Sequence, residues 1–79
     1  MGRYVKNEYY NGKIHAKVYE LVCIDKPTEG EYKDLLTAGE MYTCREVIAS
    51  NWKHTFAVTF ESGGGLPVPK KYFETIPNG

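Results

Sequence analysis

The sequence has no net charge and no long apolar run, and each of these absences excludes a class of protein. Its 79 residues carry ten Lys+Arg and ten Asp+Glu. A protein that holds duplex DNA through phosphates usually carries a basic excess, and a nucleic-acid mimic carries an acidic one. The longest apolar runs, residues 21–24 and 47–49, are far too short to cross a membrane. The sequence therefore predicts neither of these two roles and no membrane segment.

Cysteine and histidine are also scarce, with two of each. Cys23 and Cys44 both lie in apolar, strand-like runs, which predicts two reduced and buried thiols. A disulfide is the alternative, because cysteines on paired strands can meet its geometry. His15 and His54 are isolated from each other and from the cysteines, so we expect no metal site and no cofactor. The N-terminal residues lack the apolar segment of a secretion signal, which favours a cytoplasmic location.

No group of residues has the spacing of a known catalytic motif. The glycines at 63–65 are not followed by the Lys-Ser/Thr pair and helix of a phosphate loop. No serine lies on a nucleophile elbow. Acids such as Glu29 and Glu31 share one polar loop, where nothing holds the fixed geometry that acid–base catalysis needs. We therefore expect no enzyme activity.

Strand signals dominate the chain, which by its length is a single domain over residues 1–79. Asn11-Gly12 separates two β-prone runs, and this pair is the strongest hairpin signal because a type I′ turn needs φ > 0 twice. Residues 3–10 and 13–24 are predicted to form that hairpin. In the second run the apolar residues at 14, 16, 18, 22 and 24 share one parity and Glu20 interrupts it, which predicts a bulge near Glu20.

The rest of the chain continues the β pattern. Helix signals are poor, and only residues 30–39 could hold a helical turn, at 32–36. Further strands are predicted at 40–49, 53–61, 65–68 and 74–76, with tight turns at 50–51 and 62–65 and a 3₁₀ turn at 69–73. Four aromatic residues are expected to pack inside: Tyr42, Phe56, Phe60 and Phe73.

Two segments resemble SH3 domains. Residues 36–40, Leu-Thr-Ala-Gly-Glu, look like the end of the first long SH3 loop, and Trp52 follows the next turn, where SH3 domains often carry Trp. Residues 65–73, Gly-Leu-Pro-Val-Pro-Lys-Lys-Tyr-Phe, resemble the SH3 closing segment. Residues 22–25, 36–42 and 69–74 are also similar to the short SH3-like proteins encoded by phages and prophages. The resemblance covers about residues 17–76.

This resemblance implies an all-β, SH3-like barrel of about five strands over residues 13–76. The 3–12 hairpin is an extension of it, and a 3₁₀ turn precedes the last strand. It also implies a non-catalytic protein-binding module, a phage accessory protein that contacts or inhibits a host protein in host takeover or anti-defence, in the host cytoplasm. Residues 21–27 lack the tyrosine pair of peptide-binding SH3 domains, so one aromatic wall of the groove is missing.

The resemblance further implies where a partner binds. Tyr32, Trp52, Pro69 and Tyr72 converge on one surface in the SH3-like alignment, with Tyr32 partly replacing the missing wall. Such flat rings suit a proline-rich or extended peptide. The adjacent acids Glu29 and Glu31 would meet a basic residue of that peptide. Trp52 is either an exposed platform or a cap over one end of the barrel.

Three alternatives depend on the N-terminal hairpin or on the whole chain. Residues 1–19 carry four bases against Glu8, whereas residues 20–46 carry seven acids against three bases. The basic hairpin could bind single-stranded nucleic acid by stacking and phosphate contacts. Its surface would comprise Arg3, Tyr4, Lys6, Tyr9, Tyr10 and Lys13. The hairpin could also extend the sheet or join a homodimer, and the chain could be a minor virion component.

Overall fold

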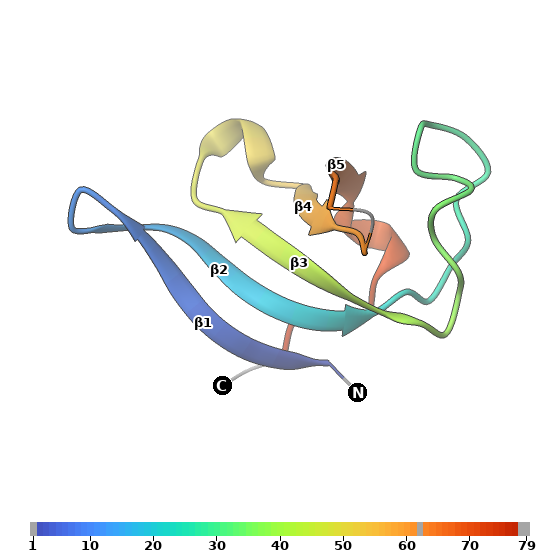
Figure 1. The fold of residues 1–79 in the computed structure, drawn as a ribbon, viewed down its shortest axis with the longest axis horizontal. Helices are drawn as coiled ribbons and strands as arrows, with labels where there is room; N and C mark the ends of the chain where they lie inside the picture. Colours follow the sequence, from blue (N-terminus) through green and yellow to red (C-terminus); the bar gives the residue numbers. More distant parts are fainter. Residues whose placement is uncertain (1, 62, 78–79) are drawn as a thin grey trace.

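The computed structural model describes residues 2–61 and 63–77, which form an antiparallel sheet of five strands joined in chain order. The strands are β1 (Arg3–Tyr10), β2 (Lys13–Val22), β3 (Met41–Val47), β4 (Thr55–Thr59) and β5 (Gly65–Pro69). Of two 3₁₀ turns, η1 (Ser50–Trp52) precedes β4 and η2 (Lys70–Tyr72) follows β5. The described residues contain no α-helix. The sheet is open, with β1 and β5 at its edges (Figure 1). The predicted all-β class is confirmed, but the sheet does not close into the predicted barrel.

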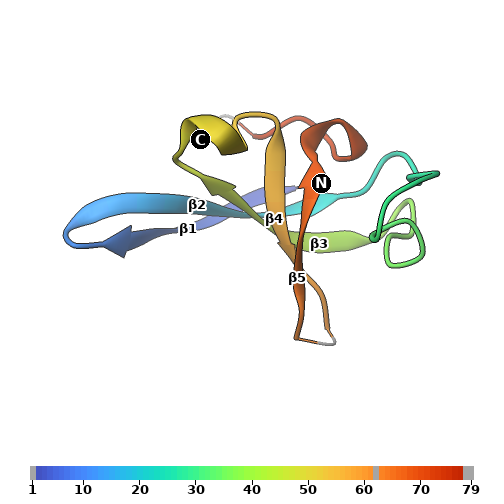
Figure 2. The same cartoon turned by 90° about the horizontal axis from the view of Figure 1, so that it is seen from above.

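The predicted N-terminal hairpin forms and lengthens the sheet. Asn11 has φ 52° and Gly12 has φ 76°, so both central residues adopt the positive φ that a type I′ turn requires. The turn end of the β1–β2 hairpin extends beyond the remaining strands (Figure 2), whereas β2 pairs with β3 from Ala16 to Val22. The strand β1 therefore lies at the sheet edge, with β2 as its neighbour.

The irregularities of the hairpin lie elsewhere than predicted. The β1–β2 register shifts at Val5 and at His15, whereas the β2–β3 register runs without a shift from Ala16 to Val22. The prediction of a bulge in β2 near Glu20 is therefore wrong. The predicted inward parity holds only for Ala16 and Val18, because Ile14 is 40% exposed and the residues buried beyond Val18 have the opposite parity.

The covered face of β2 changes along the strand. Ala16 and Val18 are buried in the first part, then Tyr19 and Leu21, and Cys23 just after the strand ends. In contrast, Ile24 is 54% exposed. Because residues 21–24 are all apolar, both faces satisfy the hydrophobic pattern there, and only the packing of distant segments selects one.

The core lies against the second half of β2. Its buried residues are Tyr19, Leu21, Cys23, Leu36, Cys44, Phe56, Val58, Val68 and Phe73. The predicted aromatic core is confirmed, since Phe56 and Phe73 are buried and Tyr42 and Phe60 pack on the cluster half-buried. Phe73 meets Phe56 edge-on with ring centroids 5.8 Å apart, and Tyr42 at 6.3 Å.

The end of the chain returns to β2 without forming the predicted strand at 74–76. Its backbone makes one bridge, between Cys23 and Phe73, and Glu74 N donates to Val22 O at 3.1 Å. The Val22 N–H, which a neighbouring strand would use, donates instead to the Glu74 carboxylate at 2.8 Å. The same carboxylate accepts from Gly2 N at 2.7 Å, so one side chain ties both chain ends to β2.

Several predicted boundaries also shift. The strands predicted at 13–24, 40–49 and 53–61 are shorter than predicted. Bends, a 3₁₀ turn and a further turn occupy residues 48–54, between β3 and β4. Residues 31–35 form turns rather than a helical turn. Ser62, in the predicted turn at 62–65, lies outside the described residues. Both the 3₁₀ turn after β5 and the long loop between β2 and β3 occur as expected.

Candidate functional site

The loop between β2 and β3 is fixed to the core at its base and near its end. Cys23 N donates to Glu40 O at 2.9 Å and Gly39 N to Cys23 O at 2.8 Å, which closes the base. Two side chains of the loop are buried, Pro27 and Leu36, the latter 2% exposed. The loop is therefore held in one place although it contains no regular element.

Tyr32 is the aromatic residue that this loop presents. Two reverse turns carry it, through hydrogen bonds from Lys33 N to Gly30 O at 3.3 Å and from Leu35 N to Tyr32 O at 3.0 Å. Gly30 has φ 92°, and a Cβ there would lie 2.8 Å from Cζ of the Tyr32 ring. The ring therefore lies against the glycine backbone, in a position that a larger residue at 30 would block.

The Tyr72 ring lies against the Tyr32 ring. Their ring centroids are 6.1 Å apart with an interplanar angle of 53°. The η2 turn that carries Tyr72 begins directly after Pro69, and Ile24 N donates to Tyr72 O at 2.8 Å. The structure thus brings Tyr32 and Tyr72 together from the loop and the η2 turn, and Pro69, the last residue of β5, directly precedes that turn.

Trp52 lies at the end of the β4–β5 pair where η2 begins. Among the aromatic pairs of residues 2–61 and 63–77, none joins Trp52 to Tyr32 or Tyr72. Thr55 pairs with Pro69, and Lys70 N donates to His54 O at 2.9 Å, so the turn after Trp52 lies beside the start of η2. The indole is half-buried and lies outside the buried core cluster. It is neither a fully open platform nor a core residue.

Charged residues are neighbours of the tyrosine pair in the chain. Glu29 and Glu31 are exposed on the loop and take part in none of the three salt bridges found in the described part of the chain. Lys71 Nζ lies 5.2 Å from the Tyr72 ring centroid. Lys70 is held by Glu46 at 2.9 Å. The carboxylates of the loop are thus available to a basic ligand.

The residues of the alternative nucleic-acid surface are exposed on the hairpin, but they do not share one face. Tyr4 is paired across the strands with Tyr19 and Lys6 with Val18, which are successive residues of β2 and so point to opposite faces. The rings of Tyr4 and Tyr19 meet at 5.7 Å. The side chains of Tyr9 and Tyr10 are 63% and 68% exposed and, as neighbours in a strand, also point apart.

The remaining members of that surface differ in how free they are. Arg3 forms a salt bridge with Glu20, which removes part of its charge from a phosphate ligand. Lys13 is exposed and pairs with Tyr10 next to the turn.

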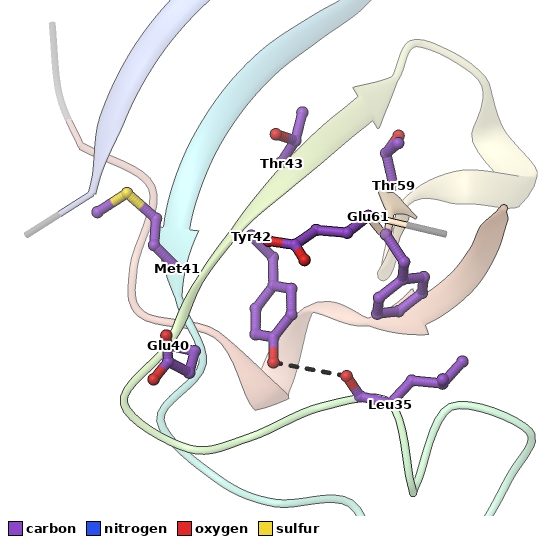
Figure 3. A pocket seen from close by; sticks show the side chains of 8 residues that line it. Leu35, Glu40, Met41, Tyr42, Thr43, Thr59 and Glu61 are labelled. Atoms are coloured by element: carbon purple, nitrogen blue, oxygen red, sulfur yellow. Dashed lines mark hydrogen bonds between the residues drawn. The ribbon is translucent and has the colours of Figure 1, made fainter. Parts of the chain in front are cut away.

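A pocket that the sequence did not predict lies where β4 separates from β3. It measures about 540 Å³ and is lined by Leu35, Glu40, Met41, Tyr42, Thr43, Thr59, Phe60 and Glu61 (Figure 3). The Tyr42 hydroxyl accepts from Thr37 N at 2.8 Å and faces Leu35 O at 3.5 Å. Sequence periodicity could not find this pocket, because it forms where the β3–β4 pairing stops at Thr43 and Thr59.

The two thiols are buried and free, as expected. Burial raises the pKa of the Cys44 thiol to about 12 and also raises the pKa of the Cys23 thiol. Thiols in this state are poor nucleophiles. Residues 2–61 and 63–77 contain no group of three or more His, Cys, Asp or Glu that could hold a metal ion.

Comparison with known proteins gives no relative from which to transfer a role. No protein-family model, no curated protein and no solved structure matches this chain. Among the described residues, no helix is long and apolar enough to span a membrane.

Proposed function

We propose that this chain is a non-catalytic protein-binding module that holds a proline-rich or extended peptide against Tyr32, Tyr72 and Pro69. The contact between the Tyr32 and Tyr72 rings carries the proposal. Two rings joined in this way form a ridge of low rotamer freedom, and such aromatic residues dominate binding energy at protein interfaces. Glu29 and Glu31, exposed on the same loop, would favour a peptide that carries Arg or Lys.

An SH3-like arrangement is part of this proposal. The order of β2, long loop, β3, η1, β4, glycine turn, β5 and η2 is the order that the sequence resemblance implies. The return of Phe73 to Cys23 supports it as well. On that basis we propose the phage-type accessory role, in which the module contacts or inhibits a host protein.

Peptide titration tests the proposed function. The probes are fluorescent proline-rich peptides, in matched pairs with and without a flanking Arg. Tyr72→Ala should weaken binding by roughly thirtyfold or more, the usual loss at an interface hot spot. Tyr10→Ala is the matched control, because Tyr10 is exposed at the distant end of β1, next to the hairpin turn. Glu31→Gln should weaken only the Arg-bearing peptides. Absence of binding by every peptide contradicts the proposal.

The variant Trp52→Ala decides whether the indole takes part. Lost peptide binding with an unchanged melting temperature would make it a binding residue. A large drop in melting temperature would make it a structural cap of the η1 turn.

Nucleic-acid binding is the second candidate, and the exposure of Tyr9 and Tyr10 favours it. Its test is titration with mixed-sequence single-stranded oligonucleotides over a range of salt. Steep salt dependence and a loss on Tyr9→Ala would support it. Binding that changes neither with salt concentration nor on Tyr9→Ala would exclude this candidate.

A further inference from the structure

The two edges of the sheet differ in their capacity to pair with another strand. The β5 edge contains Pro67 and Pro69 in a strand of five residues. Proline has no N–H, and in sheets it faces the outer side of edge strands. An added strand would therefore miss two hydrogen bonds along β5.

The β1 edge has none of these obstacles. It is eight residues long and contains no proline. Five of the nine exposed large apolar side chains of the described residues lie on this hairpin: Tyr4, Val5, Tyr9, Tyr10 and Ile14. A long edge strand with one unpaired side and exposed apolar side chains is a surface for pairing with a further strand.

The charges of β1 are complementary to those of an antiparallel copy of β1. If Asn7 of one chain faces Asn7 of the other, Lys6 lies opposite Glu8 in both halves of the pair. The Glu8 carboxylate also accepts from Arg45 Nε of its own chain at 2.8 Å, so Lys6 would join an ion pair that already exists. A shift of one residue in the pairing centre loses both opposite-charge pairs. Centring on Lys6 or on Glu8 places like charges face to face. Opposite charges across an antiparallel pair stabilise it and like charges destabilise it.

We propose that β1 pairs with β1 of a second copy, in an antiparallel register centred on Asn7. The contact is isologous, as a two-fold homodimer requires. It joins two five-stranded sheets through the proline-free edges. The register shift at Val5 lies outside the central segment 6–8, so the central pairs are unaffected by it.

Lys6→Glu tests the charge pairing. Lys6 is exposed and takes part in none of the salt bridges within the described residues, so the substitution leaves the fold of the chain intact. It converts both opposite-charge pairs to like-charge pairs and should weaken the dimer by roughly tenfold or more. The matched control is Lys13→Glu, which makes the same charge change on the inner strand β2.

Light scattering and sedimentation are the measurements. We expect the wild-type chain and Lys13→Glu to have a measured mass of twice the 9.0 kDa chain mass. At the same concentration, the Lys6→Glu dimer should dissociate into monomers. A wild-type mass of 9.0 kDa at high micromolar concentration overturns the proposal. Equal weakening by the two substitutions overturns the assigned edge.

A cysteine cross-link tests the register independently. Residues that face each other in an antiparallel pair have Cα atoms about 4.5–5.5 Å apart, within the range of a disulfide. Asn7→Cys should therefore give an interchain disulfide on mild oxidation, whereas Lys6→Cys should not. The native thiols are buried and do not compete. Cross-linking of Lys6→Cys alone would refute the register.

Discussion

Leu36 and Leu35 are neighbours of the same chemistry in opposite environments, and this makes them a direct test of how the loop is held. Leu36 is 2% exposed within the core cluster, whereas Leu35 is 45% exposed. Replacing a buried Leu by Ala costs about 2–5 kcal/mol of unfolding free energy, because apolar contact is lost and a cavity remains. The whole domain has roughly 3–5 kcal/mol to lose. Leu36→Ala should therefore remove most of the stability.

The melting temperature gives the readout. For a domain of this size, about 1 kcal/mol shifts the melting temperature by roughly 4–8 °C. We expect Leu36→Ala to melt at least about 10 °C below the wild type, or to be unfolded at 25 °C. Leu35→Ala should stay within a few degrees, since the carbonyl that faces Tyr42 belongs to the backbone and survives. Similar melting of both variants would refute the anchoring of the loop by Leu36.

Three further predictions concern pH, the thiols and the hairpin turn. Backbone N–H groups of Gly2 and then Val22 hold the pKa of Glu74 below its usual 4.5, so this contact stabilises the fold above that pH and is lost as pH falls through the lower, folded value. Glu74→Gln should flatten the acid limb of the stability curve, and the exposed Glu61→Gln should not. Both thiols should react with a thiol reagent only after unfolding, and reaction of the folded chain would contradict their burial. Gly12→Ala should lower the free energy of unfolding in urea by about 1–2 kcal/mol, because φ at this position is 76°. No neighbouring atom lies within 4 Å of the added Cβ, so the backbone conformation alone causes this loss.

Local signals predicted the strands and turns well. The Asn-Gly pair determines its own turn conformation. In β4, the alternation of apolar residues predicts that Phe56 and Val58 face the core and that Thr59 faces outward. Both features can be predicted from a few adjacent residues. The parity of β2 was not readable, since Val18-Tyr19 and residues 21–24 are apolar on both faces. Which face is covered depends on segments far along the chain, including Leu36 and Phe73.

The same distinction applies to the predicted strand at 74–76. Its composition suits a strand, but the Glu74 carboxylate occupies the Val22 N–H that a strand partner would need. A side chain that replaces a backbone acceptor leaves no trace in hydrophobic periodicity. The pocket at the β3–β4 separation escaped prediction for a related reason, since it is defined by where a pairing ends.

The two proposed contacts use separate parts of the chain, and this has a physical consequence. The tyrosine pair belongs to the long loop and to η2, whereas the proposed dimer contact belongs to β1. Neither Tyr72→Ala nor Lys6→Glu touches the residues of the other contact. A dimer through β1 would carry two copies of the tyrosine pair, and two linked sites bind a ligand with two motifs more tightly than one site does. Lys6→Glu should therefore weaken binding of a ligand with two proline-rich motifs and leave binding of a single peptide unchanged. Equal loss for both ligands would mean that β1 itself contacts the peptide.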